Sequence, residues 1–194
     1  ENQNQVRTQV NRVIQYEQNP VISEAYANFV GVGSSEGPGD DDEYDYQHLR
    51  NIRQGLLDYT YVAGYELYDG SQGGEDGEGN PNASDLHVLL QEGIGLINYT
   101  GHGSSLSCSS SGYNSSDVNQ LTNTDVHPFF WSVACVNGDF TGLTCFAESW
   151  LRATHNETGQ PTGAIATLMS TINQSWAPPM EGQDHMNLIL TEMS

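Results

Sequence analysis

Two apolar runs decide the fold of this chain. The first is Ile94-Gly95-Leu96-Ile97-Asn98-Tyr99, which leads into TGHGS at 100–104. The second is Phe129-Phe130-Trp131-Ser132-Val133-Ala134, which leads into CVNGD at 135–139. Short apolar runs with β-branched and aromatic residues, bounded by turn residues, are typical of buried parallel strands. The sequence therefore predicts two core strands, each followed by a reactive side chain at its carboxyl end.

His102 and Cys135 are those two side chains. In open α/β sheets the loops that leave the carboxyl ends of the strands form the ligand crevice, so we expect both residues at one edge of the sheet. An imidazole beside a thiol acts as its base or holds it as an ion pair, as a thiol nucleophile requires. A lone cysteine is more often a small buried apolar residue, and a His–Cys pair is also half of a zinc site. No further ligands follow at zinc spacing.

The rest of the chain alternates helix and strand patterns. Val6, Val10, Val13 and Ile14 recur at helical spacing, which predicts an amphipathic helix over 5–18. We expect further helices at 44–59, 84–92 (capped by Ser84), 117–121, 146–154 and 181–193, strands at 25–32, 61–68 and 163–169, and a surface loop at 69–82. This alternation predicts an α/β fold with a doubly wound, mostly parallel sheet and helices on both faces.

The composition limits the partners. The chain of 194 residues suits one domain, and 25 acidic residues against five basic ones give a net charge of -20. Such a surface lacks the charge that neutralises phosphates, which argues against nucleic acid or an anionic membrane. It favours cationic substrates or a salty or calcium-containing medium, or it is an adaptation for solubility. No apolar run is long enough for a transmembrane segment. A bridge between Cys108 and Cys145 would leave Cys135 free, but we expect no disulfide.

Several strings resemble a known family of peptidases. A His-Gly pair after one apolar block and an Ala-Cys pair after another are similar to the caspase-type cysteine peptidases. The longer strings NYTGHGS (98–104), VACVNGDF (133–140), CFAE (145–148) and STINQSW (170–176) resemble the gingipain family in content and order. The resemblance runs from about Val6 to the end of the chain. It implies a caspase-like fold and a secreted or cell-surface bacterial cysteine endopeptidase that cuts after arginine.

The resemblance also implies partners from the same precursor. The family's catalytic unit has an earlier subdomain and a later immunoglobulin-like domain. We therefore expect residues 1–194 to be a single caspase-like catalytic subdomain, a fragment of a larger secreted precursor. Its partners would be the other subdomains and peptide or protein substrates with arginine before the scissile bond. No organic cofactor is implied.

Catalytic roles follow from the same resemblance. It implies that Cys135 is the nucleophile, that His102 is its partner, and that the backbone N–H groups of Gly103 and Cys135 form the oxyanion hole. A carboxylate orients the histidine in the family, and Glu36 in the string SSEG (34–37) matches it, although it is also explained as an ordinary loop carboxylate. Surface or capping positions are expected for the other histidines: His48, His87, His127, His155 and His185.

An arginine pocket is implied by the string EYDYQH (43–48). It resembles the family's stretch in which an aspartate lies at the pocket floor, and Asp45 is the matching residue. A buried carboxylate can form a bidentate, charge-assisted pair with a guanidinium, which makes such a pocket selective. Asp45 is also explained as one more carboxylate at an acidic helix start. The other matching pocket positions are Thr100, Val133, Gln174, Trp176 and Met180, with Trp176 as an apolar wall.

A structural calcium ion (Ca2+) is implied in the same way. In the family it ties the loop after the nucleophile to the acidic loop. Phe140 through its carbonyl and Glu148 through its carboxylate match that site, and Asp41 in the acidic run 40–43 is predicted as a third ligand. The acidic run is also explained by the favourable interaction of carboxylates with a helix N-terminus.

Two other functions stay open. One is a non-catalytic, calcium-stabilised acidic domain that uses a peptidase scaffold for binding, since a fold does not guarantee activity. The other is a sortase-like transpeptidase of the same family, in which an amine replaces water as the acceptor. The presence of both His102 and Cys135 argues against a pure binding module, which has no chemical need for them at matching strand ends.

Overall fold

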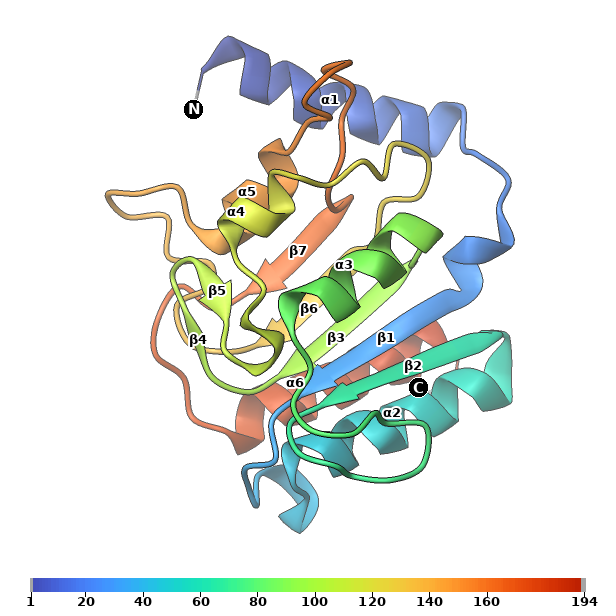
Figure 1. The fold of residues 1–194 in the computed structure, drawn as a ribbon, viewed down its shortest axis with the longest axis vertical. Coiled ribbons are helices and arrows are strands. Elements are labelled where there is room, and N and C mark those ends of the chain that lie inside the picture. Colours follow the sequence, from blue (N-terminus) through green and yellow to red (C-terminus); the bar gives the residue numbers. More distant parts are fainter. Residues whose placement is uncertain (1, 193–194) are drawn as a thin grey trace.

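A parallel sheet of five strands forms the centre of the molecule (Figure 1). The computed structural model describes residues 2–192. The strands lie in the order β2-β1-β3-β6-β7, and every neighbouring pair is parallel. Their bounds are β1 Asn28–Gly33, β2 Ala63–Tyr68, β3 Leu96–Thr100, β6 Phe129–Val133 and β7 Ala166–Met169.

Helices cover both faces of this sheet, as predicted for a doubly wound fold. α2 (Asp45–Tyr59) connects β1 to β2 and lies with α6 (Ala177–Leu190) on one face, while α3 (Ala83–Glu92) and α5 (Phe146–Arg152) cover the other (Figure 1). The chain runs from β1 outward to β2 and then crosses back to β3 on the other side of β1. The winding direction therefore reverses between β1 and β3, where open α/β sheets form their ligand crevice.

Alternate strand residues supply the two cores. Val30 and Ile97 pack in the cluster that contains Trp150, on the side of α3 and α5. Phe29 and Leu96, one residue earlier in each strand, pack in the second cluster with α2. This division follows from the two-residue period of a β-strand, and it leaves both faces of the sheet buried.

The first strand begins later than predicted. Residues Glu24–Ala27 form a 3-10 helix, and the Ser23 side chain accepts a hydrogen bond from the Ala25 N–H at its start. β1 therefore begins at Asn28 and not at residue 25. Propensity favoured a strand over this segment, but the local side-chain cap stabilises a turn of helix instead.

The last helix begins earlier than predicted. α6 starts at Ala177, followed by Pro178 and Pro179, which are tolerated in a first turn because its N–H groups have no helical partner. The helix ends at Leu190. Position 193, the predicted end of this helix, lies outside the described residues.

Three further elements complete this description of the fold. They are α1 (Gln3–Gln18), α4 (Ser115–Val118) and an antiparallel hairpin of β4 (Gly103–Ser104) and β5 (Ser107–Cys108). Strands of two residues carry no periodicity, so the sequence does not predict the hairpin. Asn82, and not Ser84 as predicted, caps α3 by accepting a hydrogen bond from the Ser84 N–H at 2.8 Å. None of the helices within residues 2–192 has both the length and the apolar character needed to cross a bilayer.

α1 is docked by a buried cation and not by its apolar stripe. The helix forms as predicted, but Val6 and Val10 of its apolar stripe remain 47% and 49% exposed. The buried residue of α1 is Arg12, whose guanidinium donates to the backbone carbonyls of Trp150 at 3.1 Å and Leu151 at 2.5 Å. These carbonyls belong to the end of α5, where helical carbonyls lack partners and favour a positive charge.

His127 predicts a loss of stability in mild acid. The side chain is 4% exposed, contrary to the expected surface position, and its Nδ1 lies 3.2 Å from the Gly163 carbonyl oxygen. Burial, with a contribution from the charge of Arg12, lowers the pKa of His127 from 6.5 to about 4. Between these two values the unfolded chain binds a proton that the folded chain excludes, so stability falls as the pH falls.

We expect the melting temperature of the wild type to decrease from pH 6.5 to pH 4 more steeply than that of His127→Asn. Asparagine keeps a donor for the Gly163 carbonyl but does not titrate. Thermal unfolding followed by circular dichroism at constant ionic strength measures both slopes. The exposed His185→Asn is the matched control and should keep the wild-type slope. Equal slopes for the wild type and His127→Asn contradict the prediction.

Candidate active site

The three predicted catalytic side chains follow neighbouring strands at their carboxyl ends. The strand-end positions that pair side by side are Gly33 of β1, Thr100 of β3 and Val133 of β6. His102 and Cys135 each come two residues after the paired position, and Glu36 comes three residues after it. The parallel register therefore delivers all three to the same edge of the sheet, at the switch point of the fold.

His102 and Glu36 form a close pair. Nε2 of His102 lies 2.9 Å from Oε2 of Glu36, and the two side chains are 53% and 57% exposed. The loop that carries Glu36 is held from behind, because the Glu36 N–H donates to the Ser34 hydroxyl at 3.0 Å. A carboxylate on Nε2 selects the ring tautomer and leaves Nδ1 for a reacting group.

The Cys135 thiol lies on a strained turn. The next residue, Val136, has φ of 51°, a left-handed conformation that a β-branched residue rarely adopts. The turn is held by a hydrogen bond from the Val136 N–H to the Ile172 carbonyl at 3.2 Å, and the half-buried thiol lies 3.8 Å from the Gln174 carbonyl. Within residues 2–192 the thiol has no hydrogen bond to His102; catalytic hydrogen bonds often form fully only with substrate bound.

Asn137 fastens the turn after the thiol to the β4–β5 hairpin. Its side chain is fully buried, and its Nδ2 donates to the carbonyls of Ser104 at 2.6 Å and Ser107 at 3.0 Å. Its Oδ1 accepts from the Ser132 hydroxyl at 2.7 Å. Because both donors and the acceptor are engaged, this one amide fixes the separation of two loops that begin on different strands.

Gly103 lies against the same turn. A Cβ at position 103 would come within 2.8 Å of Asn137 Nδ2 and 2.9 Å of Ala134 Cβ, so no side chain fits there. The Gly103 backbone therefore runs directly beside the Cys135 loop. This is where the sequence predicts one half of an oxyanion hole.

Asp45 is a fully buried carboxylate in the first turn of α2. Its Oδ2 accepts from the Ser34 hydroxyl at 2.5 Å, and its Oδ1 accepts from the indole N–H of Trp176. Burial raises the pKa of Asp45, although these two hydrogen bonds and the neighbouring His48 oppose the shift. The backbone N–H of Asp45 donates to the Glu36 carbonyl at 2.9 Å, so the carboxylates of Asp45 and Glu36 are held by a single loop.

Trp176 lies between Asp45 and the predicted catalytic histidine. Its ring meets the His102 ring edge to face, with 5.0 Å between the centroids. Met180, one turn later on α6, is fully buried. A Cβ at Gly39 would collide with Met180 Sδ and lie 2.8 Å from Trp176 Cδ1, so these two side chains close against the loop that follows β1.

Three other predicted pocket residues lie at the ends of β3 and β6 or beside Cys135. Thr100 is buried and its hydroxyl donates to Gln183 Oε1 at 2.8 Å, while Val133 beside it is 4% exposed. His48, expected at the surface, is buried on the same side, with Nε2 3.0 Å from Gln183 Oε1. Gln174 contributes a buried Nε2 that has no hydrogen-bond partner among the described residues.

The predicted calcium ligands do not come together. Asp41 lies in a 3-10 turn that packs on α6, where its charge acts on Asp184. Glu148 lies on α5, on the opposite face of the sheet, and its carboxylate accepts from Arg152 and from the Cys145 N–H at 3.1 Å. Within residues 2–192 no three His, Cys, Asp or Glu side chains are grouped as a metal site requires. The set that joins Asp41 to Glu148 therefore does not fit a calcium ion.

Asn137 is a positioning residue that the sequence analysis does not identify. The sequence did contain a chemical signal for this residue, because an amide side chain can donate to two carbonyls and accept from a hydroxyl at once, and the serine-rich hairpin supplies such groups.

Asn137→Asp removes both N–H donors of the side chain at constant shape. We expect it to slow alkylation of Cys135 by iodoacetamide about tenfold and to shift its pH profile, since small displacements of reactive groups are costly.

The control for this prediction is Asn119→Asp, which makes the same chemical change at an exposed position. Melting temperatures of both variants show how much of the effect is a loss of stability. If Asn137→Asp lowers the melting temperature but leaves the rate and pH profile of alkylation unchanged, the residue is structural only.

Calcium at Phe140 and Glu148 stays a prediction. If the ion binds there, about a hundredfold excess over its dissociation constant should raise the melting temperature by roughly 5 °C, and chelation should reverse this. Glu148→Gln should abolish the shift, whereas the exposed Glu157→Gln should keep it. A wild-type melting temperature that does not respond to calcium excludes the site.

Several known proteins are similar to this chain in sequence. The model of peptidase family C25 matches residues 1–193. Gingipain R2 and gingipain R1 of Porphyromonas gingivalis are each 39% identical over 198 residues, which cover 99% of this chain. The matched part is 25% of the first protein and 19% of the second, so the chain spans a quarter or less of these relatives.

A solved structure extends the comparison to the fold. The crystal structure of the Arg specific cysteine proteinase gingipain R matches with a TM-score of 0.90 and 38% identity, over 100% of this chain and 43% of that one. The fold class predicted from the sequence is therefore confirmed. Family model, whole-chain identity and fold agree, and the chain belongs to peptidase family C25.

Proposed function

We propose that this chain carries the catalytic centre of a secreted bacterial cysteine endopeptidase that cleaves after arginine. The observation that carries the proposal is a continuous set of contacts. Asp45 accepts a hydrogen bond from Trp176, the Trp176 ring touches His102, and His102 pairs with Glu36. A buried anion thus lies one aromatic ring away from the catalytic imidazole. A solved relative named as Arg specific adds support.

The proposed reaction uses residues at three strand ends. The Cys135 thiolate attacks the carbonyl carbon of the scissile bond, and the N–H groups of Gly103 and Cys135 stabilise the oxyanion. His102 then gives a proton to the leaving amine, and water hydrolyses the acyl-enzyme. Glu36 keeps the imidazole oriented throughout. The amide of Asn137 holds the Gly103 loop beside the thiol, so the hole needs little rearrangement.

Arginine selectivity rests on the exchange of one donor for another. In the free pocket the indole N–H of Trp176 occupies one oxygen of Asp45 and the Ser34 hydroxyl occupies the other. An arginine side chain would displace the indole and pair its guanidinium with the carboxylate, with the ring alongside its aliphatic stem. The unpartnered Nε2 of Gln174 is available for a substrate carbonyl.

The test is hydrolysis of matched fluorogenic peptides that end in Arg, Lys, Asp or Leu. We expect cleavage after Arg, and Cys135→Ala should lower kcat by roughly four orders of magnitude or more. Asp45→Asn should lower kcat/KM for the Arg peptide about a hundredfold or more, because it leaves a buried guanidinium without its counter-charge.

Asp58→Asn, on the same helix, is the matched control and should leave kcat/KM unchanged. Alkylation of Cys135 in Asp45→Asn should proceed at the wild-type rate, which separates loss of the pocket from loss of the site. Preferred cleavage after Lys would overturn the proposed selectivity. Absence of cleavage of all four peptides would favour the non-catalytic scaffold.

A further inference from the structure

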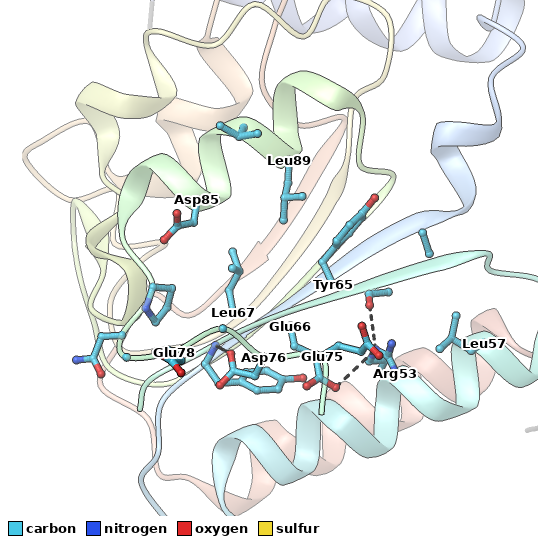
Figure 2. Close-up of a pocket in the computed structure, with 18 of the residues that line it drawn as sticks. Arg53, Leu57, Tyr65, Glu66, Leu67, Glu75, Asp76, Glu78, Asp85 and Leu89 are labelled. Atoms are coloured by element: carbon cyan, nitrogen blue, oxygen red, sulfur yellow. Dashed lines mark hydrogen bonds and ion pairs between the residues drawn. The ribbon is translucent and has the colours of Figure 1, made fainter. Parts of the chain in front are cut away.

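A groove of about 870 Å³ runs along the outer edge of the sheet (Figure 2). β2 is an edge strand, and all six of its residues line this edge groove. Residues of α3, of the loop 69–82 and of α2 line it together with β2 (Figure 2). The residues of the candidate active site do not line it, so the groove is a separate feature of the fold.

The pairing of β2 with β1 shows which backbone groups face the groove. Gly33 pairs with Tyr68, and the Gly33 carbonyl accepts from the Asp69 N–H at 2.9 Å. In a parallel pair this pattern turns the backbone groups of every second residue toward the neighbouring strand. The backbone groups of Gly64, Glu66 and Tyr68 therefore point away from the sheet.

Side chains form hydrogen bonds with only some of these outward-facing backbone groups. Arg53 Nε donates to the Gly64 carbonyl at 2.9 Å, and Asp76 Oδ1 accepts from the Tyr68 N–H at 3.0 Å. Between these caps, no hydrogen bond of the N–H and C=O of Glu66 is found among the described residues. Glu66 is 5% exposed and its carboxylate is held by Arg50, so its backbone groups lie at the base of the groove. An unpaired strand edge is a template for a further strand.

Carboxylates give the groove a negative charge. Its acidic lining residues are Glu66, Glu75, Asp76, Glu78 and Asp85. Arg53 is the one basic residue among the described lining residues, and its charge is engaged by Glu66, whose Oε1 lies 3.6 Å from Arg53 Nε. The exposed carboxylates of Glu75 and Glu78 are left to interact with a ligand.

Apolar side chains line the rest of the groove. Val62 lies just before β2 and is 66% exposed, and Val88 of α3 is 53% exposed. Leu57 of α2 borders the same end (Figure 2). The groove therefore offers apolar contacts near the start of β2 and carboxylates near its end, where Asp76 binds the Tyr68 N–H.

We propose that the edge groove binds an extended polypeptide segment with basic side chains, which adds to the sheet as a further strand beside β2. The free N–H and C=O of Glu66 supply its central backbone hydrogen bonds. Alternate side chains of an added strand point to the same side, so basic residues two positions apart can reach the carboxylates of Glu75 and Glu78. This binding does not depend on the proposed peptidase activity.

The experiment measures binding of a dye-labelled, eight-residue peptide of alternating Arg and Val by fluorescence anisotropy. The protein carries Cys135→Ala and Asp45→Asn, so it neither cleaves the peptide nor holds it in the proposed arginine pocket. Adding Glu75→Gln and Glu78→Gln should weaken binding about fivefold, as expected for two exposed ion pairs. Glu17→Gln with Glu157→Gln makes the same charge change at exposed positions elsewhere and should leave the affinity unchanged.

Two further measurements test the strand geometry. The same peptide with methylated backbone nitrogens at alternate residues keeps its charge but cannot pair, and it should lose binding. Hydrogen exchange of the Glu66 amide should slow when the unmodified peptide binds. The proposal would be overturned if both pairs of substitutions weakened binding equally. It would also be overturned if the methylated peptide bound as well as the unmodified one, or if hydrogen exchange at the Glu66 amide did not change. Because the pocket and thiol are removed in this protein, the result is independent of peptidase activity.

Discussion

The parallel register of β1, β3 and β6 is the constraint on which the site depends. Gly33, Thr100 and Val133 lie side by side only in this register. A slip of one residue would turn every side chain of a strand to the opposite face and would carry its catalytic residue out of reach of the others. Each face packs against its own helices in a close-packed cluster, so a slip would require both cores to repack, and the packing that stabilises the fold also aligns the strand ends.

Beyond the strand ends the backbone hydrogen bonds of the sheet stop, and hydrogen bonds of individual side chains hold the neighbouring loops in position. Asn137 joins the thiol turn to the β4–β5 hairpin, and Ser34 holds both the Glu36 backbone and the Asp45 carboxylate. Trp176 then connects this loop to His102. A few buried polar contacts thus decide geometry that a sheet cannot impose, which makes them costly to lose.

Local signals predicted the parts of the structure that depend on nearby residues. The two strands before His102 and Cys135 were predictable because apolar runs and turn residues mark their ends. The burial of Arg12 was not predictable, because the Trp150 carbonyl to which it donates lies 138 residues away in the sequence. The prediction that Asp41 and Glu148 bind one calcium ion was wrong for a related reason. A run of acidic residues does not reveal which face of the sheet its loop will cover. Asn137 was missed because the carbonyls that it binds become neighbours only after the hairpin folds.

Asp45 shows what a buried carboxyl group costs its fold. Burial raises the pKa of this carboxyl group, so the ionised form that a cation needs is less stable in the folded chain than in the unfolded one. That penalty arises once, during folding, and not again at each encounter with a ligand. An arginine that binds here as proposed would meet a carboxyl group already stripped of water and would exchange only one N–H donor for others. Selection for a faster or tighter site at this position therefore acts against selection for a more stable protein.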